Sequence, residues 1–354
     1  MPTSSIDTLF ACFVMICLVL SSMAGVFIVS QPFIKHSYSD YDAEMSRMMA
    51  EYLLLETGSP PDWGININET LTSFGLSKKN TSMPFDLDVD KVTRLNDENK
   101  YNLSFLEAFK ALGVKDRPFK ILIIPLFNVT VHLSSTTEGL SEITYHFEVF
   151  TERSYQPVAA NLRCYGIIGD YVTTNSSITS NSGEGSIQIS LPSDMNGTAL
   201  LIIFAQIKPK ILSYTVYSFV HNMKGYPNDV GRYATLSPIN YTLRAELTSA
   251  SDRILYAKVF TYNYWFNLTE AEGTSTVQYF EIPRILESPM IIVGTGLNSS
   301  SSEYFAEWVS YPQIPLNFGL NFTGRYHLAD AFSFRFLVTI NSSIYECKIL
   351  IGGS

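Results

Sequence analysis

The sequence predicts a chain of the α+β class that is mostly β, with one long N-terminal helix, a small α+β head and a region of β-sandwich. Three observations predict this fold. The chain opens with a long apolar run, helical spacing of apolar residues ends near Leu112, and short alternating apolar runs follow from about Tyr145. With 354 residues, 46% of them hydrophobic and 13% aromatic, the chain can bury more than one core.

Residues 9–29 carry no charged side chain. About 20 helical residues are needed to cross ~30 Å of hydrocarbon, so this run predicts a transmembrane helix in contact with the lipid bilayer. A secretory signal peptide normally begins with basic residues, whereas the first basic residue here is Lys35. We therefore expect an uncleaved signal-anchor. The alternative is a signal peptide cleaved near Ala24.

The helix is expected to continue beyond the membrane and to cover residues 6–57. Pro32 predicts a kink, because proline lacks the N–H of the helix ladder and clashes with the preceding turn. Gly58, followed by two prolines, predicts the end of the helix. Apolar residues spaced by three and four predict one stripe along its second half, formed by Tyr38, Tyr41, Met45, Met48, Met49, Tyr52 and Leu55.

Two short helices and a strand are predicted after a turn region at residues 58–64. Asp88 is a candidate N-cap for the first short helix. Residues 103–112 form the second, which ends at Gly113. Residues 119–133 are the first strong β segment.

Short strands dominate the rest of the chain. In the region 140–225 they are expected at 145–151, 158–168, 186–191, 199–207 and 214–221, with turns at 173–185 and 193–197. This spacing suits an immunoglobulin-like sandwich. A second β-rich region, 226–328, is expected to hold strands at 240–248, 253–262, 276–282, 289–294 and 303–311. A hairpin of residues 331–340 and 344–351 ends the chain, and its first strand alternates apolar and polar residues.

Eleven Asn-x-Ser/Thr sequons predict N-glycosylation and a body outside the cell. They begin at Asn68, Asn80, Asn102, Asn128, Asn175, Asn196, Asn240, Asn267, Asn298, Asn321 and Asn341. Lys35 and Arg47 follow the apolar run and weakly favour the opposite orientation, but long domains cross largely regardless of charge. The net charge of −9 argues against a nucleic-acid partner, for which a basic surface is expected.

No motif of an enzyme or a metal site is found in the sequence, so we expect no catalytic residue, no cofactor and no metal. HExxH, GxSxG and Walker A patterns are absent, and the five histidines are not spaced as ligands. The D-x-D-x-D run that starts at Asp86 has Lys91 and Asp97 where a calcium loop needs Gly and Glu. Scattered carboxylates give no sign of a glycosidase pair; they are Asp170, Glu303, Glu307 and Asp330.

Four cysteines form no CxxC pair. Cys12 and Cys17 lie in the apolar run, whereas Cys164 and Cys347 lie far apart in the body. We expect the latter two to be free buried thiols, with a disulfide between them as the alternative.

Several segments occur in a characteristic order. LLLETGSPPDWG (53–64) is followed by FGL (74–76), an LDxDKVxRL segment (87–95) and a Tyr…LG helix (101–113), and the chain ends with ADAFSFRFLVTINSSIYECKILIGG (329–353). Over residues 1–135 and 329–353 this order resembles the archaeal type IV pilin-like membrane-anchored surface proteins. The resemblance implies a pilin-like head of residues 58–135, completed by 329–354, with the β region 140–325 inserted into it.

The N-terminal residues match this family in one respect and differ from it in another. Residues 1–8 contain none of the basic residues that a pilin leader carries. Asp7 stands where such proteins place an acidic residue, and the resemblance implies a role for it in assembly with a neighbouring subunit. The alternative is that Asp7 caps the helix, whose positive N-terminal end favours a carboxylate.

The sequence thus predicts a membrane-anchored extracellular pilin-like glycoprotein with a structural or adhesive role. Its expected partners are the bilayer, further copies or other pilin-like subunits, and a surface glycan or protein. One alternative is a membrane-tethered receptor or carbohydrate-binding module; its platform would be Tyr262, Tyr264, Trp265 or Trp308, which are otherwise expected in a core. A surface hydrolase is the third alternative.

Overall fold

A computed structural model of the chain describes residues 3–114, 117–271, 273–299, 301–322 and 331–352. Within the N-terminal helix, the side chains of residues 3–7 and 27–40 lie outside this description, and with them those of Asp7 and Tyr38. The described chain is mostly β, as predicted, with one long helix at its N-terminus and two short ones after it.

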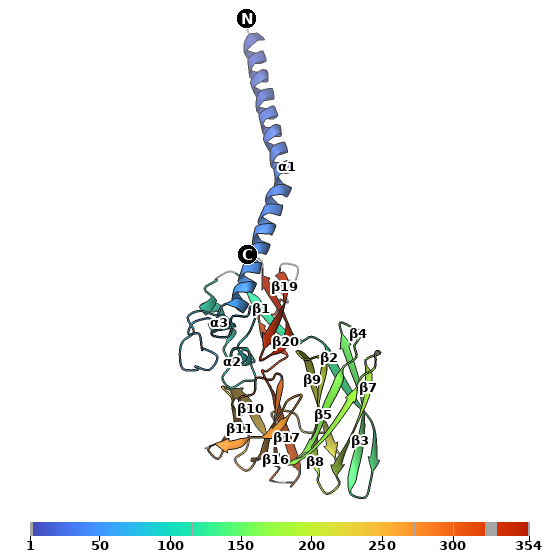
Figure 1. Cartoon of the computed structure of the whole chain (residues 1–354). Helices are drawn as coiled ribbons and strands as arrows, with labels where there is room; N and C mark the ends of the chain where they lie inside the picture. The colour runs from blue at the N-terminus through green and yellow to red at the C-terminus, as the bar shows by residue number, and fades with distance from the viewer. Residues whose placement is uncertain (1–2, 115–116, 272, 300, 323–330, 353–354) are drawn as a thin grey trace.

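Helix α1 (Thr3–Leu55) has 53 residues and therefore extends about 80 Å at 1.5 Å per residue. Pro32 does not interrupt it; Figure 1 shows one continuous, gently bent helix that rises away from the body. Gly58, which has a φ of +73°, follows the helix, and a Cβ there would lie 2.6 Å from the carbonyl oxygen of Ser73. The predicted helix is thus confirmed to within three residues at either end.

The last turns of α1 pack on a head made from chain segments that are far apart in sequence. Its antiparallel sheet has the order β18 (Leu316–Gly319), β1 (Phe119–Pro125), β20 (Ser343–Gly352) and β19 (Ala331–Ile340). Alternate residues of β1 and β20, such as Ile121 and Ile349, bury the same face with Leu53 of α1. Helices α2 (Val89–Thr93) and α3 (Phe105–Leu112) contribute to this core.

Two four-stranded sheets follow the head and enclose a second core. One contains β2 (Asn128–Glu138), β3 (Glu142–Arg153), β4 (Gln156–Pro157) and β7 (Glu184–Pro192). The other has the order β9 (Ile211–His221), β8 (Gly197–Lys208), β5 (Asn161–Ile168) and β6 (Tyr171–Ile178). A single parallel pairing of Gly197 in β8 with Tyr304 in β17 joins these four strands to four strands of the next unit, so that they form one eight-stranded sheet. Phe147, Ile189 and Ile203 lie in the core between the two layers. We call this unit the first sandwich.

The second sandwich follows the same plan. One sheet has the order β10 (Ala234–Ile239), β11 (Thr242–Leu247), β15 (Val277–Glu281) and β14 (Thr269–Ala271). The other has the order β13 (Trp265–Asn267), β12 (Ile254–Phe260), β16 (Met290–Leu297) and β17 (Tyr304–Tyr311). Its core joins the core of the head, because Leu243, Val259 and Leu53 belong to one buried cluster.

Several local predictions were wrong, and the short strands β13, β14 and β18 were not predicted. The segment 119–133 is two strands, β1 and β2, because the chain crosses from the head to the first sandwich at the buried residues Leu126 and Phe127. Residues 173–185, expected as a turn, contain most of β6, an edge strand held by its backbone pairing with β5. Strand β10 was not predicted at all, since Ser237 and Pro238 lie inside it; proline is tolerated there because β10 is an edge strand.

The two sandwiches are packed face to face through a third core. Tyr165 and Phe204 on the outer face of the first sandwich contact Phe260 and Ile291 on the outer face of the second. We call this interface the seam. Cys164 and Cys347 are buried and free, in the cores of the first sandwich and the head, so the expectation of two free thiols is confirmed.

Candidate functional site

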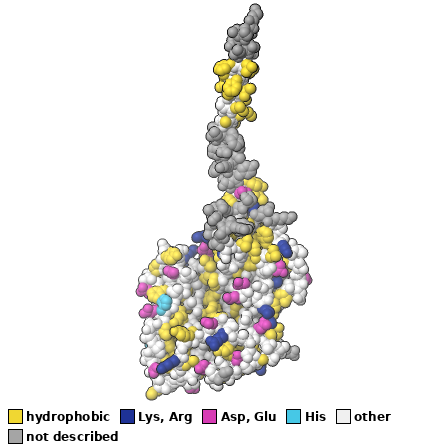
Figure 2. Space-filling model, turned by 180° about the vertical axis from the view of Figure 1, so that it is seen from behind, with side chains coloured by type: hydrophobic (Ala, Val, Ile, Leu, Met, Phe, Trp, Pro, Cys, Tyr) yellow, Lys and Arg dark blue, Asp and Glu magenta, His cyan; other side chains and the backbone are white. Residues whose placement is uncertain are grey.

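The segment Thr8–Val26 of α1 is long and apolar enough to cross a membrane, with a mean hydropathy of 2.5. None of it is buried against the rest of the chain, and Figure 2 shows its apolar side chains standing clear of the body. Length and composition of this kind fit a membrane anchor and a signal sequence alike. The helix therefore offers an apolar surface on all sides along this segment.

A second apolar surface lies on the part of α1 that reaches the head. Tyr41, Met45, Met48, Tyr52 and Leu55 are spaced by four, three, four and three residues and are all exposed, from 39% for Met45 to 63% for Tyr41. This is the spacing of a coiled-coil seam, which repeats every 3.5 residues on average. We call these five residues the α1 stripe. The core of the head is contacted by Ala50, Leu53 and Leu54, whereas the α1 stripe touches the head only at its lower part, where the hydroxyl of Tyr52 lies 3.0 Å from Oγ of Ser73 among the described contacts.

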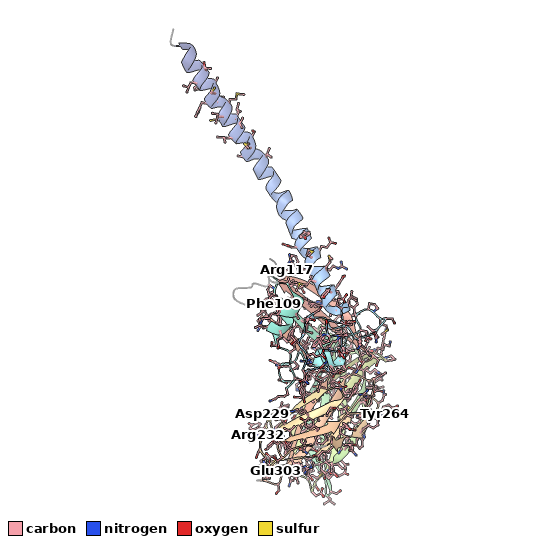
Figure 3. All side chains as sticks on the ribbon, turned by 90° about the vertical axis from the view of Figure 1, so that its left-hand side faces the viewer. Phe109, Arg117, Asp229, Arg232, Tyr264 and Glu303 are labelled. Atoms are coloured by element: carbon pink, nitrogen blue, oxygen red, sulfur yellow. The ribbon has the colours of Figure 1, made fainter. Side chains whose placement is uncertain are left out.

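The base of α1 is fixed to the body by an ion pair. Arg117, in the segment before β1, donates from Nη2 to Oδ1 of Asp42 at 2.6 Å and from Nη1 to the hydroxyl of Ser46 at 2.9 Å. Figure 3 shows Arg117 beside the lower part of α1, close to Phe109 of α3. The side chains of Arg117 and Asp42 are both partly buried. Their charge-assisted hydrogen bond therefore fixes the orientation of α1, and with it the α1 stripe, relative to the head.

The LDxDKVxRL segment builds a buried group of charges in the head. Asp88 caps α2 as predicted, since its Oδ1 accepts from the backbone N–H groups of Asp90 and Lys91 at 3.0 and 3.1 Å. The Lys91 ammonium donates to the carbonyl oxygens of Thr57 and Ser77 at 2.8 and 2.7 Å. Burial lowers the pKa of Lys91 to about 8.

Asp90 joins the head to the second sandwich. Its Oδ1 accepts from the hydroxyl of Tyr311 and from the backbone N–H of Asn240, both at 2.7 Å. Burial raises the pKa of Asp90 to about 6, and the Tyr311 hydrogen bond offsets part of that rise. Each charge of the segment thus has a partner within the protein, which indicates a structural role.

The sequons are distributed over the whole body, and the structure separates them by accessibility. Nine of their asparagines are exposed: Asn68, Asn80, Asn102, Asn128, Asn175, Asn196, Asn240, Asn267 and Asn321. Asn298 is half-buried and donates to the hydroxyl of Tyr233 at 3.1 Å. Asn341 is only 8% exposed and its Nδ2 is buried, so a glycan has no access to it in the folded protein. Asn341 is therefore the least accessible of the eleven candidates.

The other acidic residues and the histidines are dispersed or already paired. No group of three or more His, Cys, Asp or Glu side chains suited to a metal occurs among the residues that the structure describes. Glu307 is buried and accepts from the backbone N–H groups of Gly231 and Tyr233. Asp170 is exposed on the turn between β5 and β6, Glu303 is half-buried, and Asp330 lies outside the described residues.

The segment from Tyr262 to Phe266 lies at the edge of the second sandwich, and we call it the aromatic turn. Its aromatic side chains were expected in a core, but several of them are exposed. Tyr264 is 58% exposed and Trp265 is 39% exposed, while Tyr262 and Trp308 pack partly against the seam. Phe266, which the sequence did not single out, is also 39% exposed. The signal was present in the sequence, because three consecutive aromatics in a strand cannot all face one core. Tyr264 lies at one side of the body in Figure 3.

No protein-family model matches this chain, and no curated protein matches its sequence. Among solved structures, a marsupial T cell receptor is similar to 52% of this chain, which covers 96% of that receptor chain. The sequence identity is 9% and the TM-score is 0.20. A similarity this weak carries no argument about function.

Proposed function

We propose that this protein is a membrane-anchored, pilin-like surface protein whose body lies outside the cell and whose α1 stripe binds the same stripe of another copy. Its role is structural or adhesive and does not include catalysis. The observation that carries the proposal is the α1 stripe: five exposed apolar side chains with coiled-coil spacing, on the same helix as an apolar span.

The architecture of the head supports the pilin-like part of the proposal. Strands β1, β19 and β20 come from the two ends of the body sequence, and their sheet packs on the end of α1. This is the arrangement that the resemblance to type IV pilin-like proteins implies. The sandwiches then stand as an insertion on the side of the head opposite to the long helix (Figure 1).

Replacing Tyr41 and Met48, the two most exposed residues of the α1 stripe, by glutamate is expected to abolish self-association, because it places charges in an apolar helix contact. The measurement is disulfide cross-linking in membranes, with Cys12 and Cys17 replaced by serine and a single cysteine introduced by Met45→Cys. We expect a cross-linked dimer in the parent and at least a tenfold loss of it in the double variant.

The matched control introduces the cysteine by Arg47→Cys, two residues away and also exposed, but about 160° round the helix from Met45. A cross-link of equal yield at positions 45 and 47 would contradict a specific contact. Equal yields with and without the glutamates would do the same.

The accessibility of the sequons supports an extracellular body. We expect mass spectrometry of the protein from its native membranes to find glycans on several of the nine exposed asparagines and none on Asn341, whose side chain is buried. A body entirely without glycans would remove the support for this orientation, whereas a glycan on Asn341 would contradict the packing of the β19–β20 turn.

A binding role is the second candidate function, and the exposed aromatic turn favours it. Tyr264 and Trp265 offer ring faces on the surface, next to a hollow at the edge of the seam. Aromatic faces of this kind are common in recognition surfaces because they bury a large area at a low cost in side-chain entropy.

A further inference from the structure

The edge of the seam contains a hollow of about 410 Å³ that both sandwiches line. The first sandwich contributes Asn161, Arg163, Ser176 and Ser177, and the second contributes Tyr262 and Asn263. The volume lies within the range of small-ligand sites, which occur preferentially between domains. Because the lining comes from two units that are packed together through the buried seam, the hollow is formed before any ligand arrives.

Arg163 is the one charged side chain of this lining. In the strand register it lies between Phe204 of β8 and Ser176 of β6, on the same row. Its guanidinium lies over the ring of Tyr165, 6.0 Å from the centroid. No salt bridge to Arg163 is formed within the described part of the chain.

The side chain of Arg163 is supported from below by Tyr165. The buried hydroxyl of Tyr165 lies within hydrogen-bonding reach of the Arg163 side chain. Because Arg163 is only half-buried and lines the hollow, part of its side chain stays accessible to a ligand. A carboxylate also lies beside the lining, since Oε1 of Glu287 accepts from Nδ2 of Asn263 at 3.0 Å.

The composition of the lining selects a class of ligand. Among the described residues Arg163 forms an ion pair with no carboxylate, Glu287 included, so it favours an anion, and its planar fork matches a carboxylate. The hydroxyl and amide groups of Ser176, Ser177 and Asn263 suit a ligand rich in hydroxyls. The exposed ring of Tyr264, on the turn that carries Asn263, offers a flat apolar face of the kind on which a sugar ring stacks.

We propose that this hollow binds the carboxylate of an acidic sugar, with Arg163 as the anion partner, Tyr262 as part of the wall and the neighbouring Tyr264 beside its rim. The inference rests on the adhesive role proposed above and names its partner. Its outcome is separate from that of the α1 stripe, which cross-linking tests on a different part of the molecule.

The test titrates the full-length protein in detergent with a galacturonic acid trisaccharide, followed by calorimetry. We expect saturable binding, and binding at least tenfold weaker for the neutral galactose trisaccharide, because the latter lacks the charge-assisted hydrogen bonds to Arg163. Equal affinity for the two sugars would overturn the proposal. Acetate that competes as well as the trisaccharide would overturn the assignment to a sugar.

Arg163→Gln is expected to lower the affinity for the acidic sugar about tenfold or more, while Arg153→Gln, on the exposed end of β3, leaves it unchanged. Should Arg163→Gln fail to fold, the surface variants Asn263→Ala and Tyr264→Ala provide the same test, each with an expected loss of about threefold or more. Unchanged affinity in folded Arg163→Gln, or in both surface variants, would contradict the site.

Discussion

Trp63→Ala is expected to destabilise the head by about 3–5 kcal/mol, the range for removing a large aromatic from a core. Trp63 is 1% exposed, its indole N–H donates to the carbonyl oxygen of Gly75 at 3.0 Å, and its ring centroid lies 5.8 Å from that of Phe74. Lys91 and Arg94 lie over the same ring, at 5.9 and 5.7 Å from its centroid. Its loss therefore removes packing, a hydrogen bond and two cation–π contacts together.

The measurement is chemical denaturation of the full chain in detergent, followed by circular dichroism. Trp265→Ala is the matched control, because it removes the same side chain from a site that is 39% exposed, and a much smaller loss is expected there. A loss below about 1 kcal/mol for Trp63→Ala would show that the loop it belongs to does not depend on this packing.

Asp90→Ala is expected to cost about 3 kcal/mol at about pH 5, because it leaves the Tyr311 hydroxyl and the Asn240 N–H buried without an acceptor. Asp90→Asn retains an oxygen that accepts both hydrogen bonds, so it is expected to cost much less. Denaturation of the two variants beside the parent measures the difference. Equal losses in the two variants would indicate that the hydrogen bonds do not carry the effect.

The same carboxyl predicts a pH dependence. The pKa of Asp90 is about 6 in the folded protein, whereas it is 3.8 for an unperturbed aspartate, the value expected in the unfolded chain. Between these two pH values the folded state therefore binds more protons than the unfolded state. The contribution of Asp90 to stability is therefore greatest below pH 3.8 and is lost as the pH rises through about 6. Asp90→Asn removes this dependence, and a curve for Asp90→Asn that keeps the parent's slope in this window would contradict the burial of the charge.

The fold was predictable where one local signal decided the structure. The apolar run and Gly58 defined α1, Asp88 defined the start of α2, and the alternation of residues 331–340 defined β19. The fold was not predictable where tertiary packing decided the structure. The strand β6 has the Ser, Thr and Asn composition of a turn, and its pairing with β5 is a backbone interaction that composition does not encode.

The candidate sites show the same limit. A sequon is a pattern of three residues, but the burial of Asn341 depends on the packing of the β19–β20 turn. The spacing of the α1 stripe could be predicted from the sequence. The side of the helix that the head covers could not be predicted, because it depends on tertiary packing. Arg163 has no local pattern around it, because its neighbours in the hollow come from β6 and from a turn about 100 residues away.

The two chain connections between the sheet of the head and the sandwiches lie at a single end of that sheet, and this determines how the head responds to force. The chain leaves the head at Pro125 and returns at Leu316, and β1 and β18 are adjacent antiparallel strands whose register brings these two points together. A pull on the far end of the body therefore loads β1 along its own axis against β20. The paired residues from Phe119 to Pro125 would resist in shear, sharing the load along the ladder, rather than peel apart one by one.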